Sequence, residues 1–325
     1  MDPTEPARIG RAQGCLAGQL AGDSLGSLVE FMSPEEIRRY YPGGVRDLAD
    51  GGVWDILAGQ PTDDSEMALA LARTLVGRKG FDPEAIRAAY VEWYESGPFD
   101  AGNTISGALR GRLNPDSQAN GGLMRVSPLG IFGTGHSVDQ VMAWAEADAG
   151  LTHVHPVCRK ASALFAAAAA HAIWTGDGPK AVYRRIADWA DAPAVPPALR
   201  EATLAAAKEP PADCCRQSGW VLIAWQNALW QLLHAENAEE GIIDTVGRGG
   251  DTDTNAAIAG ALLGAVYGLE GIPERWVEAL RRCRPEAGRP GVRRPRPRCY
   301  WPIDFQELAE SLYRLGRQTR KTNLA

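Results

Sequence analysis

The chain has 325 residues, of which 45% are hydrophobic and 23% charged, and its formal net charge is −6. This composition is typical of a globular protein with one large domain or two small ones. The acidic balance argues against a general nucleic-acid binder, which would be basic. Residues 1–9 contain no apolar signal core, and no apolar run reaches the roughly 18 residues that a membrane helix needs. We therefore expect a cytoplasmic protein without a membrane partner.

The six cysteines, at positions 15, 158, 214, 215, 283 and 299, form no C-x-x-C pair. This pattern indicates reduced thiols rather than a disulfide framework or a zinc site.

Residues 10–32 are predicted to form a helix that carries glycines at positions 14, 18, 22 and 26. Such a stripe destabilises an isolated helix, so it indicates close approach of another backbone. Glycines at 260, 264 and 268 repeat the stripe. We predict that these two helices pack closely together in the core. On the first helix, Asp23, Ser27 and Glu30 would share one face, which either is solvated or lines a site.

Residues 33–61 are punctuated by proline and glycine, with a short helix beginning near Pro34. Helical periodicity predicts further helices over 64–78, 83–95, 137–148, 156–174, 179–190, 197–208, 219–235 and 304–316. There is little period-2 alternation and no strand–helix–strand rhythm. The chain is therefore predicted to be mainly α-helical, with one domain over residues 1–325.

The segment 281–302 differs from the rest because it contains eight arginines and five prolines. We expect an extended, flexible basic loop there, with a contact to an acidic partner as the alternative. Residues 317–325 are predicted to form a flexible tail.

Two clusters of Asp and Thr stand where predicted helices begin. The second cluster is Gly249-Gly250-Asp251-Thr252-Asp253-Thr254-Asn255, and the first is Thr62-Asp63-Asp64-Ser65. Helix capping explains one Asp or Thr in each but not several carboxylates. Carboxylates and hydroxyls suit a hard cation, and two such clusters could bridge a pair of divalent ions despite the positive end of each helix dipole.

The donor types favour magnesium or manganese over zinc, because neither cluster offers cysteine or paired histidines. The chain has no G-x-S-x-G elbow, Walker loop or G-x-G-x-x-G fingerprint. The residues alone therefore predict a metal-dependent hydrolase of unspecified substrate.

The chain also resembles a known family through motifs that occur in the family's order over nearly its whole length. These are Gly14–Gly18, Gly22-Asp23, Glu30–Met32, Gly59–Met67, Phe99-Asp100, Gly102–Thr104, Asn120–Arg125, Thr152–Pro156, Ser218–Val221 and Gly249–Thr254. The family is that of the ADP-ribosylglycohydrolases, and the resemblance is strongest to its dinitrogenase reductase-activating glycohydrolase branch. Trp220 stands where that branch has tyrosine, and the Arg/Pro-rich segment is longer here.

The resemblance implies a single-domain, all-α orthogonal helical bundle with two divalent cations, Mg²⁺ or Mn²⁺. The metal ligands that it implies are Thr62, Asp63, Asp64, Asp251, Asp253 and Thr254. It implies catalytic carboxyl groups at Glu30 and Asp100. The residues that it implies for the ADP-ribose cleft are Asn103, Asn120, Gly121, Gly122, Met124, Arg125, His153 and Trp220.

The implied activity is hydrolysis of mono-ADP-ribose from ADP-ribosylated protein side chains, arginine above all. Alternatives are another ADP-ribose linkage (serine, poly-ADP-ribose, a nucleic acid base or a small conjugate), a toxin-immunity role, or a non-catalytic ADP-ribose binder. With no exposed heptad or edge strand in the pattern, we expect a monomer.

Overall fold

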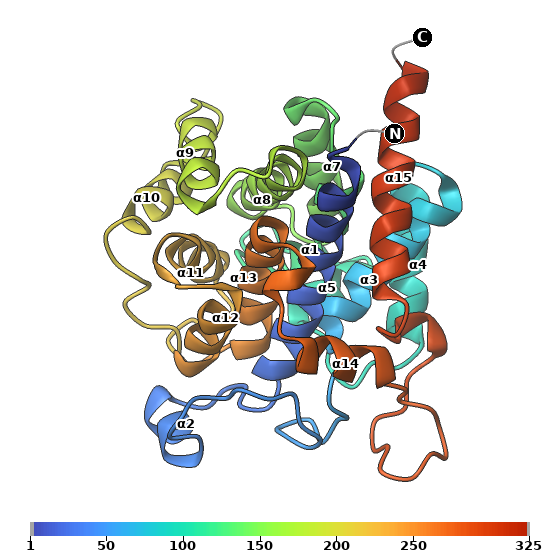
Figure 1. Ribbon diagram of the computed structural model, residues 1–325, viewed down its shortest axis with the longest axis vertical. Helices are drawn as coiled ribbons and strands as arrows, with labels where there is room; N and C mark the ends of the chain where they lie inside the picture. The colour runs from blue at the N-terminus through green and yellow to red at the C-terminus, as the bar shows by residue number, and fades with distance from the viewer. Residues whose placement is uncertain (1–2, 324–325) are drawn as a thin grey trace.

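The protein is built on two antiparallel helices that pack side by side at its centre, α1 (Glu5–Gly26) and α13 (Thr252–Tyr267) (Figure 1). The structure is a computed structural model and describes residues 3–323. Where the two helices touch, a Cβ atom built on Gly18 would lie 2.1 Å from the carbonyl oxygen of Gly260. A Cβ atom built on Gly260 would likewise lie 2.1 Å from the carbonyl oxygen of Gly18. The predicted close packing of the two glycine stripes is confirmed.

Other helices surround this pair on both sides (Figure 1). On one side lie α7 (Val138–Gly150), α8 (Pro156–Thr175), α9 (Pro179–Ala190), α10 (Pro197–Ala205), α11 (Val221–His234) and α12 (Ala238–Gly247). On the other side lie α3 (Asp63–Arg78), α4 (Pro83–Glu95), α5 (Asn103–Leu109) and α15 (Phe305–Asn323). The remaining helices are α2 (Pro34–Tyr40), α6 (Ser127–Phe132) and α14 (Glu274–Arg282), with 3-10 turns at Asn120–Gly122, Leu269–Gly271 and Arg298–Tyr300.

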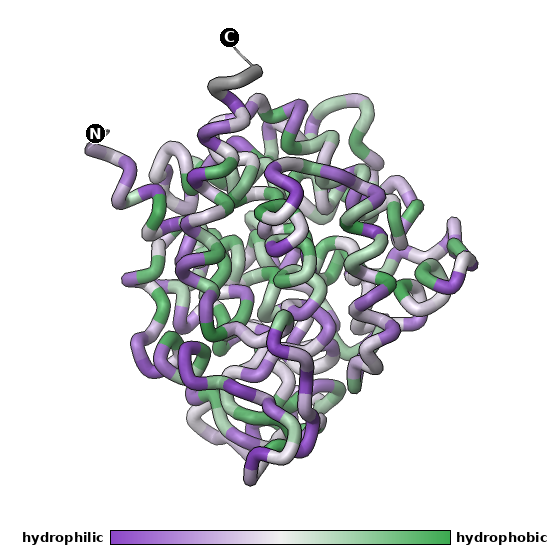
Figure 2. Tube along the Cα trace, turned by 90° about the vertical axis from the view of Figure 1, so that its right-hand side faces the viewer, coloured by the Kyte–Doolittle hydropathy of each residue, from purple (hydrophilic) through white to green (hydrophobic). Residues whose placement is uncertain are grey.

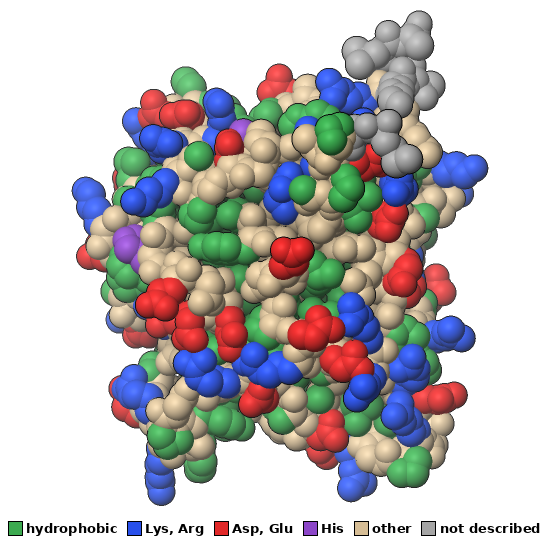
Figure 3. Space-filling view, viewed as in Figure 1, with side chains coloured by type: hydrophobic (Ala, Val, Ile, Leu, Met, Phe, Trp, Pro, Cys, Tyr) green, Lys and Arg blue, Asp and Glu red, His purple; other side chains and the backbone are tan. Residues whose placement is uncertain are grey.

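The core is continuous through the middle of the molecule, where hydrophobic segments gather in Figure 2. Residues 3–323 contain no β-strand, only two isolated bridges, so the all-α prediction is confirmed. On the face seen in Figure 3, acidic and basic side chains are intermixed, most densely in the lower half of the view. Exposed ion pairs contribute little to stability, so the fold depends mainly on its apolar core. No helix among the described residues is both long and apolar enough to span a membrane.

Several boundaries differ from the sequence prediction. The helices α6, α12 and α14 were not predicted, and α15 continues through residue 323 where a flexible tail was expected from 317; residues 324 and 325 lie outside the described part. The first helix ends at Gly26, not near residue 32. Its last carbonyl accepts a hydrogen bond from Thr252 Oγ1 at 2.7 Å, and the chain then turns. Glu30 therefore lies in a loop, and the predicted helical face of Asp23, Ser27 and Glu30 is wrong.

The glycine contact predicts a large effect from a single methyl group. We expect Gly18→Ala to destabilise the protein by about 3 kcal/mol or more, because its Cβ would meet backbone that cannot yield. Gly10→Ala lies in the same helix with nothing within 4 Å of the added Cβ, and we expect it to be neutral or stabilising by up to about 1 kcal/mol. Chemical denaturation measures both. Equal stability of the two variants would contradict the packing argument.

Candidate metal centre

The second Asp cluster is held in a double-glycine turn before α13. Gly249 and Gly250 have φ values of +71° and +76°, which side chains rarely adopt. A Cβ on Gly250 would also lie 1.9 Å from the carbonyl oxygen of Cys214. The turn pairs with the chain after Glu30, because Phe31 donates its N–H to Gly250 at 2.7 Å and Gly250 donates its own to Met32 at 3.0 Å. This pairing sets Glu30 beside the cluster.

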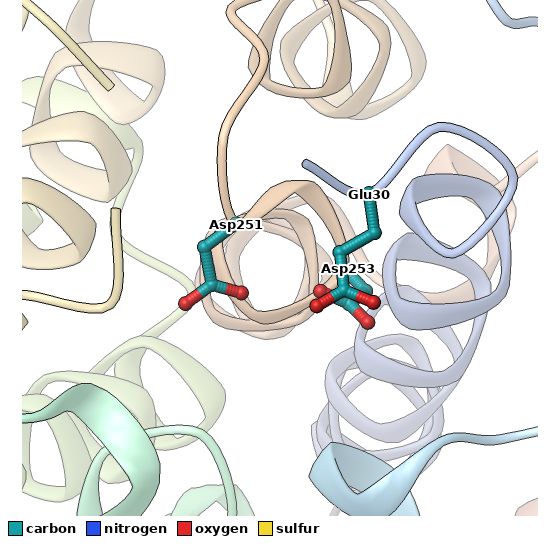
Figure 4. A group of neighbouring side chains, drawn as sticks. All are labelled: Glu30, Asp251 and Asp253. Carbon is teal, nitrogen blue, oxygen red and sulfur yellow. The ribbon is translucent and has the colours of Figure 1, made fainter. Parts of the chain in front are cut away.

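Glu30, Asp251 and Asp253 converge at this point (Figure 4). Each offers a carboxylate oxygen, and these oxygens lie within 4.8 Å of one another. Glu30 comes from the loop after α1, whereas Asp251 and Asp253 come from the start of α13, and the Glu30 and Asp253 carboxyls face each other (Figure 4). The packing of α1 against α13 brings these carboxyls together, since a Cβ on Gly26 would lie 2.4 Å from the backbone nitrogen of Asp253.

The first Asp cluster lies at the N-terminus of α3 and is oriented by Asp23. Thr62 donates its N–H and its hydroxyl to the Asp23 carboxylate, and the Ser65 N–H also donates to it, at 2.8–3.2 Å. Asp23 thus caps α3 from a different helix. The Thr62 hydroxyl also lies 2.9 Å from Asp64 Oδ2. Asp23 therefore holds the predicted ligands Thr62 and Asp64 in place.

Asp100 and Asn120 connect the two clusters to the surrounding loops. Asn120 Nδ2 donates to Asp251 Oδ2 at 2.7 Å, and the Gly102 N–H donates to Asp63 Oδ2 at 3.3 Å. Burial, together with the charge of Asp100, raises the pKa of Asp63, so these two carboxyls lie close together. Asp64 interacts with Asp251 and Thr254, and Glu30 lies near both Asp100 and Asp251, so all six predicted ligands and both predicted catalytic carboxyls lie in one region of the protein.

This group of carboxyls is electrostatically unfavourable by itself. Burial, together with the charges of Asp100 and Asp251, raises the pKa of Glu30 to about 8. Burial also raises the pKa of Asp253, with the charges of Glu30 and Asp64 adding to the effect. Like charges at such separations favour bound protons or a bound cation.

The donor set fits a hard divalent cation. It consists of carboxylate and hydroxyl oxygens, and the buried Asp64 Oδ1 atom has no hydrogen-bond partner in the described part of the chain. A buried acidic cluster of this kind could hold metal, and Glu30, Asp251 and Asp253 are the residues best placed to begin it.

An open recess of about 640 Å³ adjoins the centre. Its lining comprises Asp116, Gln118, Ala119, Gln217, Ser218, Gly219 and Trp220. A Cβ on Gly219 would lie 3.6 Å from Asp251 Oδ2, so the wall of the recess lies against this carboxyl. The indole of Trp220 is 36% exposed, and its N–H donates to Gln118 Oε1 at 3.0 Å. The recess therefore offers an aromatic surface and several polar groups to a ligand.

The predicted cleft residues divide into an accessible and a buried group. Trp220 and Asn103 are exposed, whereas Asn120, Gly121 and Gly122 form a buried 3-10 turn next to Asp251. Met124 is likewise only 4% exposed, and Arg125 is fully buried.

Arg125 binds the protein itself. Its guanidinium donates to Asp148 Oδ2, to the Gly121 carbonyl at 3.1 Å and to Thr152 Oγ1 at 2.9 Å. Arg125 was predicted to line the ADP-ribose cleft, but it is fully buried and its guanidinium supports the Asn120–Gly122 turn from the interior. His153 is also fully buried, and burial with the nearby Arg125 charge lowers its pKa to about 3, so it is neutral.

Sequence analysis missed Trp54, whose Nε1 donates to Glu30 Oε2 at 2.5 Å. It stands in a glycine-rich loop with no periodic pattern, so only its three-dimensional contacts reveal it. Asp23 was noted as a polar residue of α1, but its role as the cap of α3 depends on a contact 39 residues away in the chain.

Comparison with known proteins identifies the family. A sequence profile of the ADP-ribosylglycohydrolases matches residues 4–321. The chain is 32% identical over 286 residues to the ADP-ribosyl-dinitrogen reductase glycohydrolase of Rhodospirillum rubrum, covering 85% of this chain and 92% of that protein. It is 30% identical over 294 residues to the ADP-ribosylarginine hydrolase Tri1 of Pseudomonas putida (strain GB-1), covering 85% of this chain and 76% of Tri1.

Among solved structures, the chain superposes on one named ADP-ribosylglycohydrolase-related protein complex with a TM-score of 0.79 and 28% identity, covering 96% of this chain and 99% of the other. The chain belongs to the ADP-ribosylglycohydrolase family, whose members are enzymes that hydrolyse ADP-ribose linkages. The expected family and its dinitrogenase reductase-related branch are confirmed.

The raised pKa values predict that the metal-free protein loses stability as the pH rises. In the unfolded chain the pKa of Glu30 is about 4.3, but in the folded protein it is about 8. Below the lower value both states are protonated, and between the two values only the unfolded state releases its proton. Stability therefore falls with rising pH, by up to about 1.4 kcal/mol per pH unit for Glu30 alone, and levels off above about pH 8.

Thermal unfolding in chelator from pH 5 to 9 tests this expectation. Glu30→Gln should flatten the curve, and added Mn²⁺ should restore stability at pH 8. A melting temperature that rises with pH throughout this range would contradict the assignment of these charges.

Proposed function

We propose that the protein is a metal-dependent hydrolase that removes mono-ADP-ribose from arginine side chains of proteins. The observation that carries the proposal is the convergence of two Asp/Thr clusters that lie far apart in sequence, since Asp64 of the first interacts with Asp251 and Thr254 of the second and Glu30 lies beside them. The names of two relatives support the substrate class, because one acts on ADP-ribosyl-dinitrogen reductase and the other on ADP-ribosylarginine. We propose that it acts as a cytoplasmic monomer, and its six free thiols support a reducing compartment.

Two divalent cations, Mg²⁺ or Mn²⁺, would be held by the six oxygen donors of the two clusters. These donors belong to Thr62, Asp63, Asp64, Asp251, Asp253 and Thr254. When bound, such ions would polarise substrate oxygens and lower the pKa of water. We propose that Asn120 orients Asp251 through their hydrogen bond, and that Asp23 orients the α3 ligands.

Asp100 and Glu30 are the carboxyls proposed to exchange the proton with the leaving guanidine and the attacking water. Both have raised pKa values through burial. A raised pKa brings a carboxyl closer to neutral pH, where proton transfer in either direction is most effective.

The recess is proposed to receive the ADP-ribose, with Trp220 stacking on the base or ribose. Asn103, Asn120, Gly121 and Gly122 would line the side nearest the carboxyls. Met124, Arg125 and His153 are proposed to support this lining from the interior.

The first test is release of free ADP-ribose from an arginine-ADP-ribosylated protein. We expect release with Mg²⁺ or Mn²⁺ and none with chelator, because the oxygen donors need a cation between them. Substrates modified on serine serve as the comparison. Release from the serine substrate alone would contradict the arginine assignment, and release in chelator would contradict the metal requirement.

A second test removes one carboxylate without changing its shape. Asp253→Asn should abolish Mn²⁺ binding and lower turnover by at least about 100-fold, because it removes charge from the centre of the cluster. Asp139→Asn is the matched control, since Asp139 stands in the first turn of α7 as Asp253 stands in that of α13, but on the surface. Titration calorimetry and initial rates measure both. Full activity in Asp253→Asn would disprove the assignment of the site.

A further inference from the structure

The Arg/Pro-rich segment is anchored deep inside the protein at one residue. Arg296 is only 6% exposed, and its guanidinium binds both carboxylate oxygens of Glu66, at 2.7 and 2.8 Å. It also donates to the carbonyl and hydroxyl oxygens of Ser96, and Trp93 Nε1 donates to Glu66. The expectation of a flexible loop is wrong at this residue, because a buried bidentate ion pair fixes it.

This anchor ties the segment to the helix of the first Asp cluster. Glu66 lies in the first turn of α3, three residues after Asp63. The anchored chain is further held by Trp301, whose Nε1 donates to the Arg296 carbonyl at 2.8 Å. We call residues 284–297 the strap. These contacts fix the strap in position against α3, the helix that begins with the proposed metal ligands of the first Asp cluster.

Two residues before the anchor, the strap contacts a second element of the site. Arg294 Nε donates to the carbonyl oxygen of Trp54 at 3.1 Å, and the buried Gln60 donates to the Arg294 carbonyl at 2.7 Å. Trp54 belongs to a tight turn closed by two hydrogen bonds between Gly51 and Ile56. The strap thus holds the backbone of this turn in place from outside.

The indole of Trp54 connects the turn to the carboxyl cluster. Its Nε1 donates to Glu30 Oε2 at 2.5 Å, and its ring lies 5.8 Å from that of Phe99, the neighbour of Asp100. Glu30 faces the negative charges of Asp100 and Asp251, which repel its ionised form. The Trp54 N–H is a donor to one of the two Glu30 carboxylate oxygens, so it fixes the position of this side chain beside Asp100 and Asp251.

We propose that the strap positions Glu30 through Trp54, so that Arg294 and Trp54 act as positioning residues for the metal centre. The inference rests on the proposed function, since it concerns the same site. Its chain of contacts runs from Glu66 through Arg296 and Arg294 to Trp54, and ends at Glu30.

Trp54→Phe tests the last contact, because it removes the indole N–H and keeps a ring against Phe99. We expect about a tenfold loss of Mn²⁺ affinity by titration calorimetry and a similar fall in kcat, with KM nearly unchanged. In a Glu30→Ala background, Trp54→Phe should change either quantity less than twofold, because the acceptor of the indole N–H is already gone. An equal loss in both backgrounds would show that Trp54 does not act through Glu30.

Arg294→Ala tests the strap, with Arg289→Ala as the matched control. Both arginines are exposed in the same segment, but the Arg289 guanidinium donates to the carbonyl of Arg284 within the strap itself. We expect Arg294→Ala to lower Mn²⁺ affinity about threefold and to increase deuterium uptake over residues 51–57, whereas Arg289→Ala should change neither. Identical behaviour of the two variants would overturn the proposal.

These measurements separate the two proposals. If the wild-type protein released no ADP-ribose from any linkage, the proposed function would fail, but Mn²⁺ affinity and deuterium uptake would still decide the role of the strap. Uptake over residues 51–57 is measured without metal, so it decides the strap–turn contact even if Mn²⁺ does not bind.

Discussion

The backbone contact between α1 and α13 is the constraint on which the rest of the structure depends. At Gly18 and Gly260 the two backbones touch directly, because neither residue has a side chain. The contact continues along α1 to Gly26, which lies beside Asp253. Because both helices are rigid, closing this contact delivers the end of one helix to the start of the other. The carboxyls at these two ends are then brought together by packing rather than by attraction.

Bringing several buried carboxyls together is electrostatically unfavourable, and hydrogen-bond donors around the group reduce this effect. Asp23 is surrounded by donors from Thr62 and Ser65, and Asn120 supplies one to Asp251. The helix starts of α3 and α13 add their positive ends to the same region. These devices orient the carboxyls without neutralising them, so the pKa values of the group remain raised. A site with surplus negative charge in fixed positions is suited to a doubly charged cation.

The sequence predicts those structural features that are determined by residues close together in the chain. The spacing of the glycine stripes and of the Asp/Thr clusters is visible in the sequence, so the central helix pair and the candidate metal ligands could be predicted. The end of α1 could not, because Asp23, Ser27 and Glu30 continue a helical pattern that a hydroxyl from Thr252 interrupts. Arg296 likewise resembles its exposed neighbours, and its burial follows from Glu66, 230 residues away. Arg125 matched a motif, but a motif does not show which way a side chain points.

The long sequence separation between α1 and α13 has a consequence for synthesis. Its buried glycine face packs on α13, and Thr252 lies 226 residues beyond Gly26. At typical translation rates, roughly ten to fifty seconds separate the two segments at the ribosome. During that interval α1 has an apolar surface with no partner to cover it. Native packing of α1 therefore waits until α13 has been synthesised, and this long separation in sequence favours slow folding.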